Sequence, residues 1–282
     1  MKTTQELQQI ATQVRRDILR MTTAAQSGHP GGSLGTADWF TAMQFNILDI
    51  DPARFTMEGT DEDMLFVSQG HITPVIYSTM ARRGYFPVPE LATFRQFGTR
   101  LQGHPSTAHG LPGIRMASGS LGQGMSVGIG AALGKKMTSD SHLVYTMHGD
   151  GELQEGQIWE AAMFAGAKHV DNLIATIDYN RQQIDGTVDQ VMDLGNLQAK
   201  FEAFLWKVVV IADGNDIQQV LDGMAKAKAL TGQGSPVCVI LHTQMGYGVD
   251  FMQDTNKYHG AVLSADDLPK ALSQLEETLG DF

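Results

Sequence analysis

Residues 141–186 read SHLVYTMHGDGELQEGQIWEAAMFAGAKHVDNLIATIDYNRQQIDG and contain two apolar runs that each end in a polar turn. The first run, LVYTM, is rich in strand formers and predicts a buried strand. The sequence HGDG breaks it, with glycines where the backbone must bend tightly. Apolar residues then recur at helical spacing, and a second buried run, LIATID, ends in the polar turn YNRQ. The stretch therefore predicts a strand–turn–helix–strand–turn unit.

The two turns carry oxygen-bearing side chains where a parallel sheet binds its ligands. In an open parallel α/β sheet, ligands bind beyond the carboxyl ends of the strands. Asp150 and Asn180 follow two successive strands, which we expect to be neighbours. A carboxylate and an amide oxygen facing one crevice suit Mg²⁺, which completes its shell with waters and a ligand's phosphates. The N–H of Gly151, near the start of a helix, is placed to meet a phosphate oxygen.

Two other interpretations of these turns stay open at this point. Asp150 and Asn180 could cap a helix and close a turn, as both residue types do routinely. The second alternative is the dinucleotide fingerprint G-x-G-x-x-G, which is a weak match. Gln154 occupies the position of its third glycine, and the nearby GQG at 122–124 fails likewise at Val127.

Composition and charge exclude several classes of function. The 282 residues are 42% hydrophobic, enough for the core of one large α/β domain. The net charge of −11, without a Lys/Arg run, argues against nucleic acid or an anionic membrane as partner. The single cysteine, Cys238, lies in the apolar run VCVIL, so we expect a buried thiol and a cytoplasmic protein. The N-terminus resembles no secretory signal, and no stretch is apolar enough to span a membrane.

Strand and helix patterns alternate along the rest of the chain. We predict further strands at 64–68, 207–211 and 237–242, and helices at 3–26, 74–83, 126–137, 216–230 and near 195–205 and 265–277. The glycine-rich residues 27–33 predict a tight loop. Residues 98–124 predict a long irregular region, which in a compact domain is usually functional or disordered. Together these patterns predict one domain, residues 1–282, with a doubly wound, mostly parallel sheet and helices on both faces.

Six of the nine histidines adjoin a glycine in loops or at strand ends, namely His29, His71, His104, His109, His148 and His259. A single loop histidine is usually a surface residue. Several around the carboxyl end of one sheet indicate a site, because histidine donates to phosphate or hydroxyl oxygens and exchanges protons near neutral pH. We assign no role in binding to His109 and His148, which we place in turns or in an outer layer of the site.

The central unit resembles the thiamine diphosphate signature, in which GDG is followed, a helix and a strand later, by a polar turn with Asn. The segments GDGELQEGQIWEAA and NLIATIDYNRQQIDG together are similar to transketolases in particular. This implies the thiamine diphosphate-binding fold and a metal, Mg²⁺ or else Ca²⁺ or Mn²⁺, held by Asp150, Asn180 and the carbonyl of Gln182. It places Asn180 and the Gly151 amide at the cofactor, and matches Glu155 to a carboxylate that links two active sites across a dimer.

The histidine loops resemble transketolase motifs one by one. SGHPGG implies that His29 contacts the cofactor and sugar hydroxyls. The GH pair at residues 70–71 makes His71 a diphosphate contact. GHP places His104 near the substrate's hydroxyls. KYHG implies that His259 reaches both diphosphate and substrate. The resemblance thus implies His29, His104 and His259 as catalytic residues.

Two further segments match the cofactor pocket of transketolases. In SGSLGQG, Gly119 and Leu121 fall where the family lines the cofactor with main chain and an apolar side chain. Ile184 falls where the family packs a branched side chain against the thiazolium ring. The resemblance thus implies that the chain holds the diphosphate end of the cofactor and part of the substrate channel.

The resemblance spans essentially the whole chain but not the pyrimidine-binding domain of transketolases. It implies the N-terminal subunit of a split transketolase, active with a C-terminal partner subunit in an α₂β₂ heteromer. The implied reaction transfers a two-carbon ketol unit from a ketose phosphate to an aldose phosphate, as in the pentose phosphate pathway. The alternatives are the α subunit of a 2-oxoacid dehydrogenase, a deoxyxylulose phosphate synthase, a split transketolase for an unusual sugar, or a non-catalytic scaffolding subunit.

Overall fold

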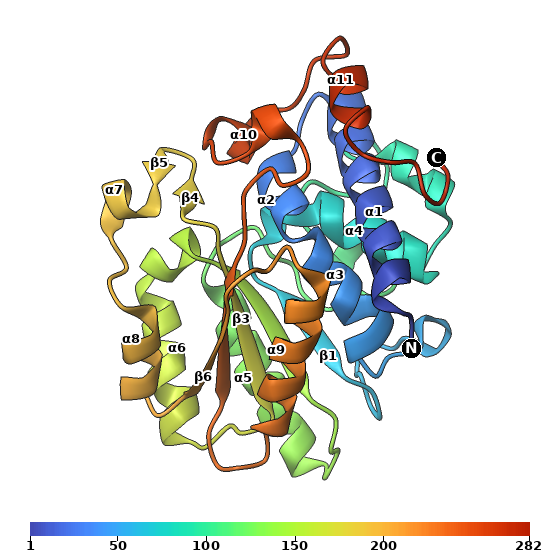
Figure 1. The fold of residues 1–282 in the computed structure, drawn as a ribbon. Helices are drawn as coiled ribbons and strands as arrows, with labels where there is room; N and C mark the ends of the chain where they lie inside the picture. The colour runs from blue at the N-terminus through green and yellow to red at the C-terminus, as the bar shows by residue number, and fades with distance from the viewer.

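One sheet of five parallel strands organises the molecule (Figure 1). The computed structural model describes all 282 residues. The strand order is β1-β2-β3-β7-β6, and all four neighbouring pairs are parallel, which confirms the predicted sheet. The strands are β1 (Met64–Val67), β2 (Val144–Gly149), β3 (Leu173–Tyr179), β6 (Lys207–Ile211) and β7 (Val237–His242). A separate antiparallel hairpin of two-residue strands, β4 (Gln182–Gln183) and β5 (Gly186–Thr187), follows β3.

Helices cover both faces of this sheet (Figure 1). One face is covered by α1 (Thr4–Ala25), α3 (Ala37–Ala42), α4 (Thr73–Arg83) and α9 (Ile217–Ala229), and the other by α5 (Gln123–Met137), α6 (Gly156–Ala167) and α8 (Leu197–Ala203). Shorter helices are α2 (Pro30–Gly35), α7 (Val188–Met192), α10 (Lys257–Gly260) and α11 (Leu268–Leu272). Of these, α2 and α10 pack together above the carboxyl end of the sheet.

Alternate strand residues point into two separate cores. Tyr145 and Met147 of β2 belong to a core of 42 buried residues that includes side chains of α1, α3, α4 and α9. Val144 belongs to a second core of 22 buried residues, shared with α5, α6 and α8. Cys238 is fully buried in this second core, as predicted. Because successive side chains point to opposite faces, a sheet covered on both sides requires continuous apolar runs such as LVYTM.

The loop predicted at residues 27–33 is wrong in its second half, which forms the start of α2. Pro30 occupies the first turn of this helix, where its fixed φ favours helix and its missing N–H costs nothing. Gly28, with φ +142°, makes the sharp entry into the turn. Gly31 then allows close packing, because a side chain there would lie 2.7 Å from the carbonyl oxygen of Tyr258. His29 is therefore held at a helix start.

The C-terminal helix predicted near 265–277 is also wrong in extent, because α11 spans only Leu268–Leu272. Pro269 lies in its first turn. Beyond the helix, the Arg16 guanidinium of α1 donates to the carbonyl oxygens of Leu272 at 3.0 Å and Leu275 at 2.7 Å. Arg16 also pairs with Asp281 at 2.7 Å. These bonds satisfy the terminal carbonyls in place of further helical turns. The N-terminal helix, in contrast, agrees with its prediction to within one residue at each end.

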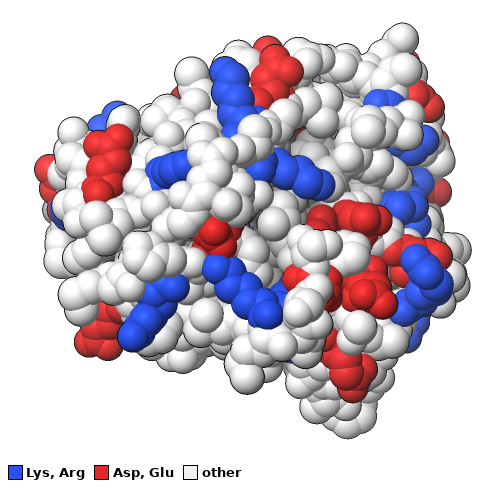
Figure 2. All heavy atoms as spheres, turned by 90° about the horizontal axis from the view of Figure 1, so that it is seen from below, with Lys and Arg blue, Asp and Glu red and all other residues white.

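The end of the molecule opposite α2 and α10 is seen from below in Figure 2. Basic and acidic side chains are interspersed on this face. Ion pairs such as Lys135–Asp140 at 2.6 Å and Lys136–Asp171 at 2.5 Å join the last turn of α5 to the loops that precede β2 and β3. No helix combines the length and apolar character required to cross a membrane.

Candidate functional site

A cavity of about 410 Å³ lies at the carboxyl ends of the strands. All twelve residues predicted for the site line it: His29, His71, His104, Gly119, Leu121, Asp150, Gly151, Glu155, Asn180, Gln182, Ile184 and His259. These residues come from segments that span most of the sequence. The residues that follow β1, β2 and β3 converge because the turns after parallel strands emerge at one edge of the sheet. His29, His104, Gly119 and Leu121 reach the cavity from loops that do not follow a strand.

The two polar turns after β2 and β3 lie side by side, as predicted. Asp150 is almost completely buried, with 2% of its surface exposed. Its Oδ1 accepts the N–H of Gly151 at 2.7 Å, and its Oδ2 accepts the N–H of Arg181 across the gap between the turns. The Gly151 amide, predicted to face a phosphate, is thus engaged by Asp150 in this structure. The carboxylate is fixed in place by the main chain of both turns.

Asn180 is oriented by a residue that the sequence analysis missed. Its Nδ2 donates to Asp178 Oδ2 at 2.8 Å, while its Oδ1 accepts the N–H of Gln182 at 2.9 Å. Asp178 is buried at the end of β3 and also accepts a hydrogen bond from the hydroxyl of Thr243, which follows β7. The only signal for Asp178 in the sequence is its position as the acidic residue at the end of the apolar run LIATID.

The acidic side of the cavity has the chemistry of a divalent cation site. Burial, together with the charge of Asp178, raises the pKa of Asp150 to about 8. Burial raises the pKa of Asp178 to about 6, although hydrogen bonds from Thr243 and Asn180 counteract it. Two buried carboxyl groups without a cationic partner are costly, and a bound metal relieves that cost. The oxygen donors of Asp150, Asn180 and Gln182 therefore fit a hard cation such as Mg²⁺.

Four histidines form the opposite side of the cavity. The ring centroid of His29 lies 5.1 Å from that of His71, 6.4 Å from that of His104 and 5.7 Å from that of His259. His71 follows Gly70, where any side chain would collide with Ser118. The Nδ1 atoms of His29 and His259 are buried without a hydrogen-bond partner. The cluster thus presents unused polar atoms beside the cavity, which suits a polar ligand.

Burial keeps these histidines uncharged near neutral pH. It lowers the pKa of His29 to about 4, with further contributions from His259, Arg95 and His104. Burial likewise lowers the pKa of His71 well below its ordinary value, and also lowers those of His104 and His259. Neutral imidazoles both donate and accept hydrogen bonds, so the cluster can bind hydroxyl groups and exchange protons with them.

Glu152 is a second residue that the sequence analysis missed. Its carboxylate accepts the N–H of Gly122 at 2.7 Å, the N–H of Gly149 at 3.0 Å and the hydroxyl of Ser68. Burial would raise the pKa of Glu152, but hydrogen bonds led by His148 hold it below its ordinary value. Glu152 thereby joins the ends of β1 and β2 to the start of α5. His148 lies within β2 and supports Glu152 rather than lining the cavity.

The remaining side of the cavity is an open rim. Ile184 is 60% exposed, and Glu155 is exposed as well. The hairpin that carries Ile184 is connected to the rest of the site by hydrogen bonds from Asn256 Nδ2 to the Ile184 carbonyl at 3.2 Å and from Gln154 Nε2 to Gln183 Oε1 at 3.0 Å. An exposed branched side chain at the mouth of a polar cavity can cover an aromatic or heterocyclic ligand.

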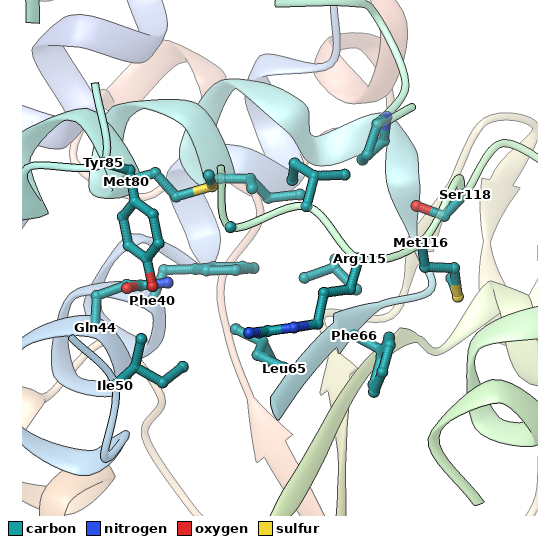
Figure 3. A pocket seen from close by; sticks show the side chains of 15 residues that line it. Phe40, Gln44, Ile50, Leu65, Phe66, Met80, Tyr85, Arg115, Met116 and Ser118 are labelled. Carbon is teal, nitrogen blue, oxygen red and sulfur yellow. The ribbon is translucent and has the colours of Figure 1, made fainter. Parts of the chain in front are cut away.

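Two other features do not compete with this cavity. Asp61, Asp140 and His142 are grouped closely enough to hold a metal ion, but none lines the cavity, and Lys135 already pairs with Asp140 at 2.6 Å. A second, apolar pocket contains Phe40 and Met80, and Arg115 reaches into it (Figure 3). Its volume of about 30 Å³ leaves room for no more than one or two waters.

The fold and this cavity define a cofactor-binding protein of the thiamine diphosphate class, and comparison with known proteins specifies the family. Residues 7–279 match the family described as "Transketolase, thiamine diphosphate binding domain". The chain belongs to this family. The predicted transketolase resemblance and the fold that it implies are therefore confirmed, and the chain is of the ketol-transferring transketolase type.

Relatives of two lengths match the chain. It is 38% identical to a 6-deoxy-6-sulfo-D-fructose transketolase subunit of Clostridium sp. (strain MSTE9), covering 96% of this chain and 98% of the relative. It is 33% identical to an apulose-4-phosphate transketolase subunit of Phocaeicola vulgatus, covering 94% and 92%. A transketolase mutant from Pichia stipitis matches in structure with a TM-score of 0.89 and 30% identity, over 99% of this chain but 42% of that longer chain.

Proposed function

We propose that residues 1–282 form one domain that binds thiamine diphosphate through a divalent metal and acts as the N-terminal subunit of a two-subunit transketolase. The observation that carries the proposal is the cavity, which is lined by buried Asp150, with Asp178 behind it, and by four neutral histidines. The names of the two shorter relatives, each a transketolase subunit, support the assignment. The chain spans about two fifths of the longer transketolases that it matches.

We assign distinct roles to the two sides of the cavity. Asp150, Asn180 and the carbonyl of Gln182 would hold the metal, with Mg²⁺ first and Ca²⁺ or Mn²⁺ as substitutes. Asp178 orients Asn180 by accepting a hydrogen bond from its Nδ2. The Gly151 amide would bind the diphosphate. Asp150 and Asn180 are already oriented by main-chain hydrogen bonds, so metal binding requires little reorganisation of their side chains. The Gly151 N–H, in contrast, must leave Asp150 Oδ1 to reach a phosphate oxygen.

The histidine side would bind the other end of the diphosphate and the substrate. His71 and His259 would donate to diphosphate oxygens, which suits imidazoles that are neutral before binding. His29 and His104, with His259, would bind the sugar's hydroxyls and transfer protons to and from them. Gly119, Leu121 and Ile184 would enclose the cofactor ring. The bound cofactor itself supplies the electron sink for carbon–carbon cleavage.

The partner would supply the pyrimidine-binding domain, in an α₂β₂ assembly. An exposed apolar face on α5 and α6 supports such an assembly, since Met163 is 55% and Phe164 44% exposed there. Gly130 and Gly134 on α5 leave open space for a close approach. Glu155, exposed near this face, would contribute to the network that connects two active sites. We place the enzyme in the cytoplasm.

The substrate would be a ketose phosphate, with pentose phosphates as the family's usual sugars. A split transketolase for an unusual sugar is a second candidate, favoured by relatives named for 6-deoxy-6-sulfo-D-fructose and apulose-4-phosphate. The two candidates differ in which donor ketose is cleaved. A panel of donors that includes xylulose 5-phosphate, apulose 4-phosphate and the sulfonated fructose separates them.

The test of the proposed function is reconstitution. The purified chain, supplied with thiamine diphosphate, Mg²⁺ and the donor panel, should produce no turnover. Adding a C-terminal transketolase chain from the same genome should give ketol transfer from one of these donors. Turnover by the isolated chain would contradict the two-subunit proposal. Absence of cofactor binding by the reconstituted complex would contradict the assignment of the cavity.

A further inference from the structure

Arg95 lies behind the histidine side of the cavity and has no acidic partner. Its Nη1 donates to the hydroxyl of Ser27 at 2.7 Å, and its Nη2 donates to the carbonyl oxygen of Gly103 at 3.3 Å. Its Nε is buried without a hydrogen-bond partner. Burial lowers the pKa of the guanidinium, and no carboxylate is among the groups that act on it. Burying part of a guanidinium without an acidic partner costs free energy, so we expect a role that explains the position of Arg95.

The main chain around Arg95 is shaped for these two contacts. Arg95 has φ +58°, in the left-handed region that is strained for side chains other than glycine. Its N–H donates to the carbonyl oxygen of Leu101 at 3.0 Å and closes the intervening loop. The guanidinium then lies directly against Gly103, where an added Cβ would be 2.7 Å from Arg95 Cζ. Any residue other than glycine at position 103 would force the guanidinium of Arg95 to move.

The two loops that Arg95 contacts each carry a histidine of the cluster. Ser27 precedes His29 by two residues, and Gly103 directly precedes His104. The groups that face His29 are His71, His104, His259 and Arg95, so Arg95 is the one permanent charge among them. The charge of Arg95 also acts on His104.

We propose that Arg95 is a positioning residue that ties the His29 loop to the His104 loop and so sets the spacing of these two imidazoles. The inference rests on the proposed function only in taking both histidines as contacts of the substrate. Through its fork-shaped donors, Arg95 joins the Ser27 hydroxyl to the Gly103 carbonyl, and no other side-chain hydrogen bond connects these two segments directly. Its charge favours the neutral form of both imidazoles, in which they accept as well as donate hydrogen bonds.

The first test observes the histidine rings of the isolated chain by NMR with ¹⁵N-labelled histidine, using H29N and H104N for assignment. R95M should shift the ring signals of His29 and His104 and raise both pKa values. R95K, which keeps the charge but not the fork, should shift the signals with a smaller rise in pKa. G103A should shift the same ring signals with a smaller rise in pKa than R95M, because the new methyl group displaces the guanidinium but leaves its charge nearby. R100M is the matched control, since Arg100 lies in the same loop but pairs with Glu90 at 2.6 Å.

The second test uses the reconstituted complex. R95M should raise KM for the donor ketose on the order of tenfold or more, because misplacement of binding groups is costly. The affinity for thiamine diphosphate should change less, because only His29 of the two imidazoles is also expected to contact the cofactor. Unaltered His29 and His104 signals in folded R95M would overturn the proposal, and so would an equal change in R100M. If R95M does not fold, G103A decides the question in the same way. If the ring signals shift as expected but the reconstituted complex shows no ketol transfer, the proposed function is contradicted. The positioning role of Arg95 is then still supported.

Discussion

The acidic side and the histidine side of the cavity are built by different means. Asp150, Asp178 and Asn180 lie at the carboxyl ends of two adjacent strands, and hydrogen bonds there fix their orientation. The four histidines come from loops that are distant in sequence, and His29 and His259 keep an unpartnered Nδ1. The sheet thus preorganises the acidic side by itself, whereas the histidine side depends on packing between loops and on the ligand.

The largest effect is expected on the acidic side, from Asp150→Ala. Removal of the one charged metal ligand should weaken Mg²⁺-dependent binding of thiamine diphosphate on the order of 100-fold or more, beyond the loss typical of an outer-shell change. The free energy of unfolding without metal should fall little, because Asp150 is already buried against Asp178 at a cost. Calorimetric titration with the cofactor, in the presence and absence of Mg²⁺, measures the first effect and urea unfolding the second.

Asp189→Asn is the matched control for that change. Asp189 pairs with Arg181 in the same region but is exposed and does not line the cavity. Cofactor binding should be unchanged in this variant. Equal losses of cofactor affinity in the two variants would show that changing any acidic residue in this region weakens binding. Such a result would contradict the assignment of Asp150 as a metal ligand.

A smaller effect is expected from Asp178→Asn, which keeps the shape of the side chain but changes its charge. The amide can no longer accept the hydrogen bond from Asn180 Nδ2 as a charged partner. Loss of such outer-shell support should reduce metal affinity by roughly 10- to 100-fold. Titration with Mn²⁺, followed by electron paramagnetic resonance, gives the affinity directly. An affinity equal to that of the wild type would mean that Asn180 needs no help from Asp178.

On the histidine side, His104→Asn should separate substrate binding from cofactor binding. His104 is predicted to meet sugar hydroxyls rather than the diphosphate, so the affinity for thiamine diphosphate should stay within about twofold. The kcat/KM for the donor should fall on the order of tenfold, the cost of about 1.4 kcal/mol for a lost hydrogen bond. Steady-state kinetics of the reconstituted complex measures this effect. A fall in cofactor affinity instead would place His104 at the diphosphate.

The smallest effect concerns pH and the stability of the isolated chain. Since burial lowers the pKa of His29 to about 4, the folded chain binds fewer protons there than the unfolded chain between pH 6.5 and 4. The contribution to stability is complete above pH 6.5 and is lost as the pH falls toward 4. The free energy of unfolding of His29→Asn should therefore decline less steeply over this range. Parallel curves for the two proteins would contradict the burial of a neutral His29.

The sequence was informative where a local pattern determines a local structure. The runs LVYTM and LIATID and the turns after them predicted β2, β3 and the neighbouring positions of Asp150 and Asn180, because apolar strands and polar turns are coded over a few residues. The motifs around the histidines and glycines predicted a common site for segments as distant as 29 and 259. Here the resemblance to a family, rather than spacing, made the connection.

The parts that escaped prediction depend on contacts between distant segments. Asp178 is held by Thr243, which directly follows a strand that is adjacent in space but distant in sequence. Glu152 gains its role from Ser68 and Gly122 in the same way. The helix α11 is short because Arg16 of α1 binds the carbonyls that follow it. The pattern of apolar residues within one segment cannot predict hydrogen-bond partners that lie in a distant segment.

The most direct measurement of the central claim is the anomalous diffraction of Mn²⁺ in crystals grown with thiamine diphosphate. The ion should lie between the Asp150 carboxylate, the Asn180 amide oxygen and the Gln182 carbonyl, with diphosphate oxygens completing its shell. An ion bound at Asp61, Asp140 and His142 instead, or a diphosphate bound without any ion at Asp150, would contradict the account.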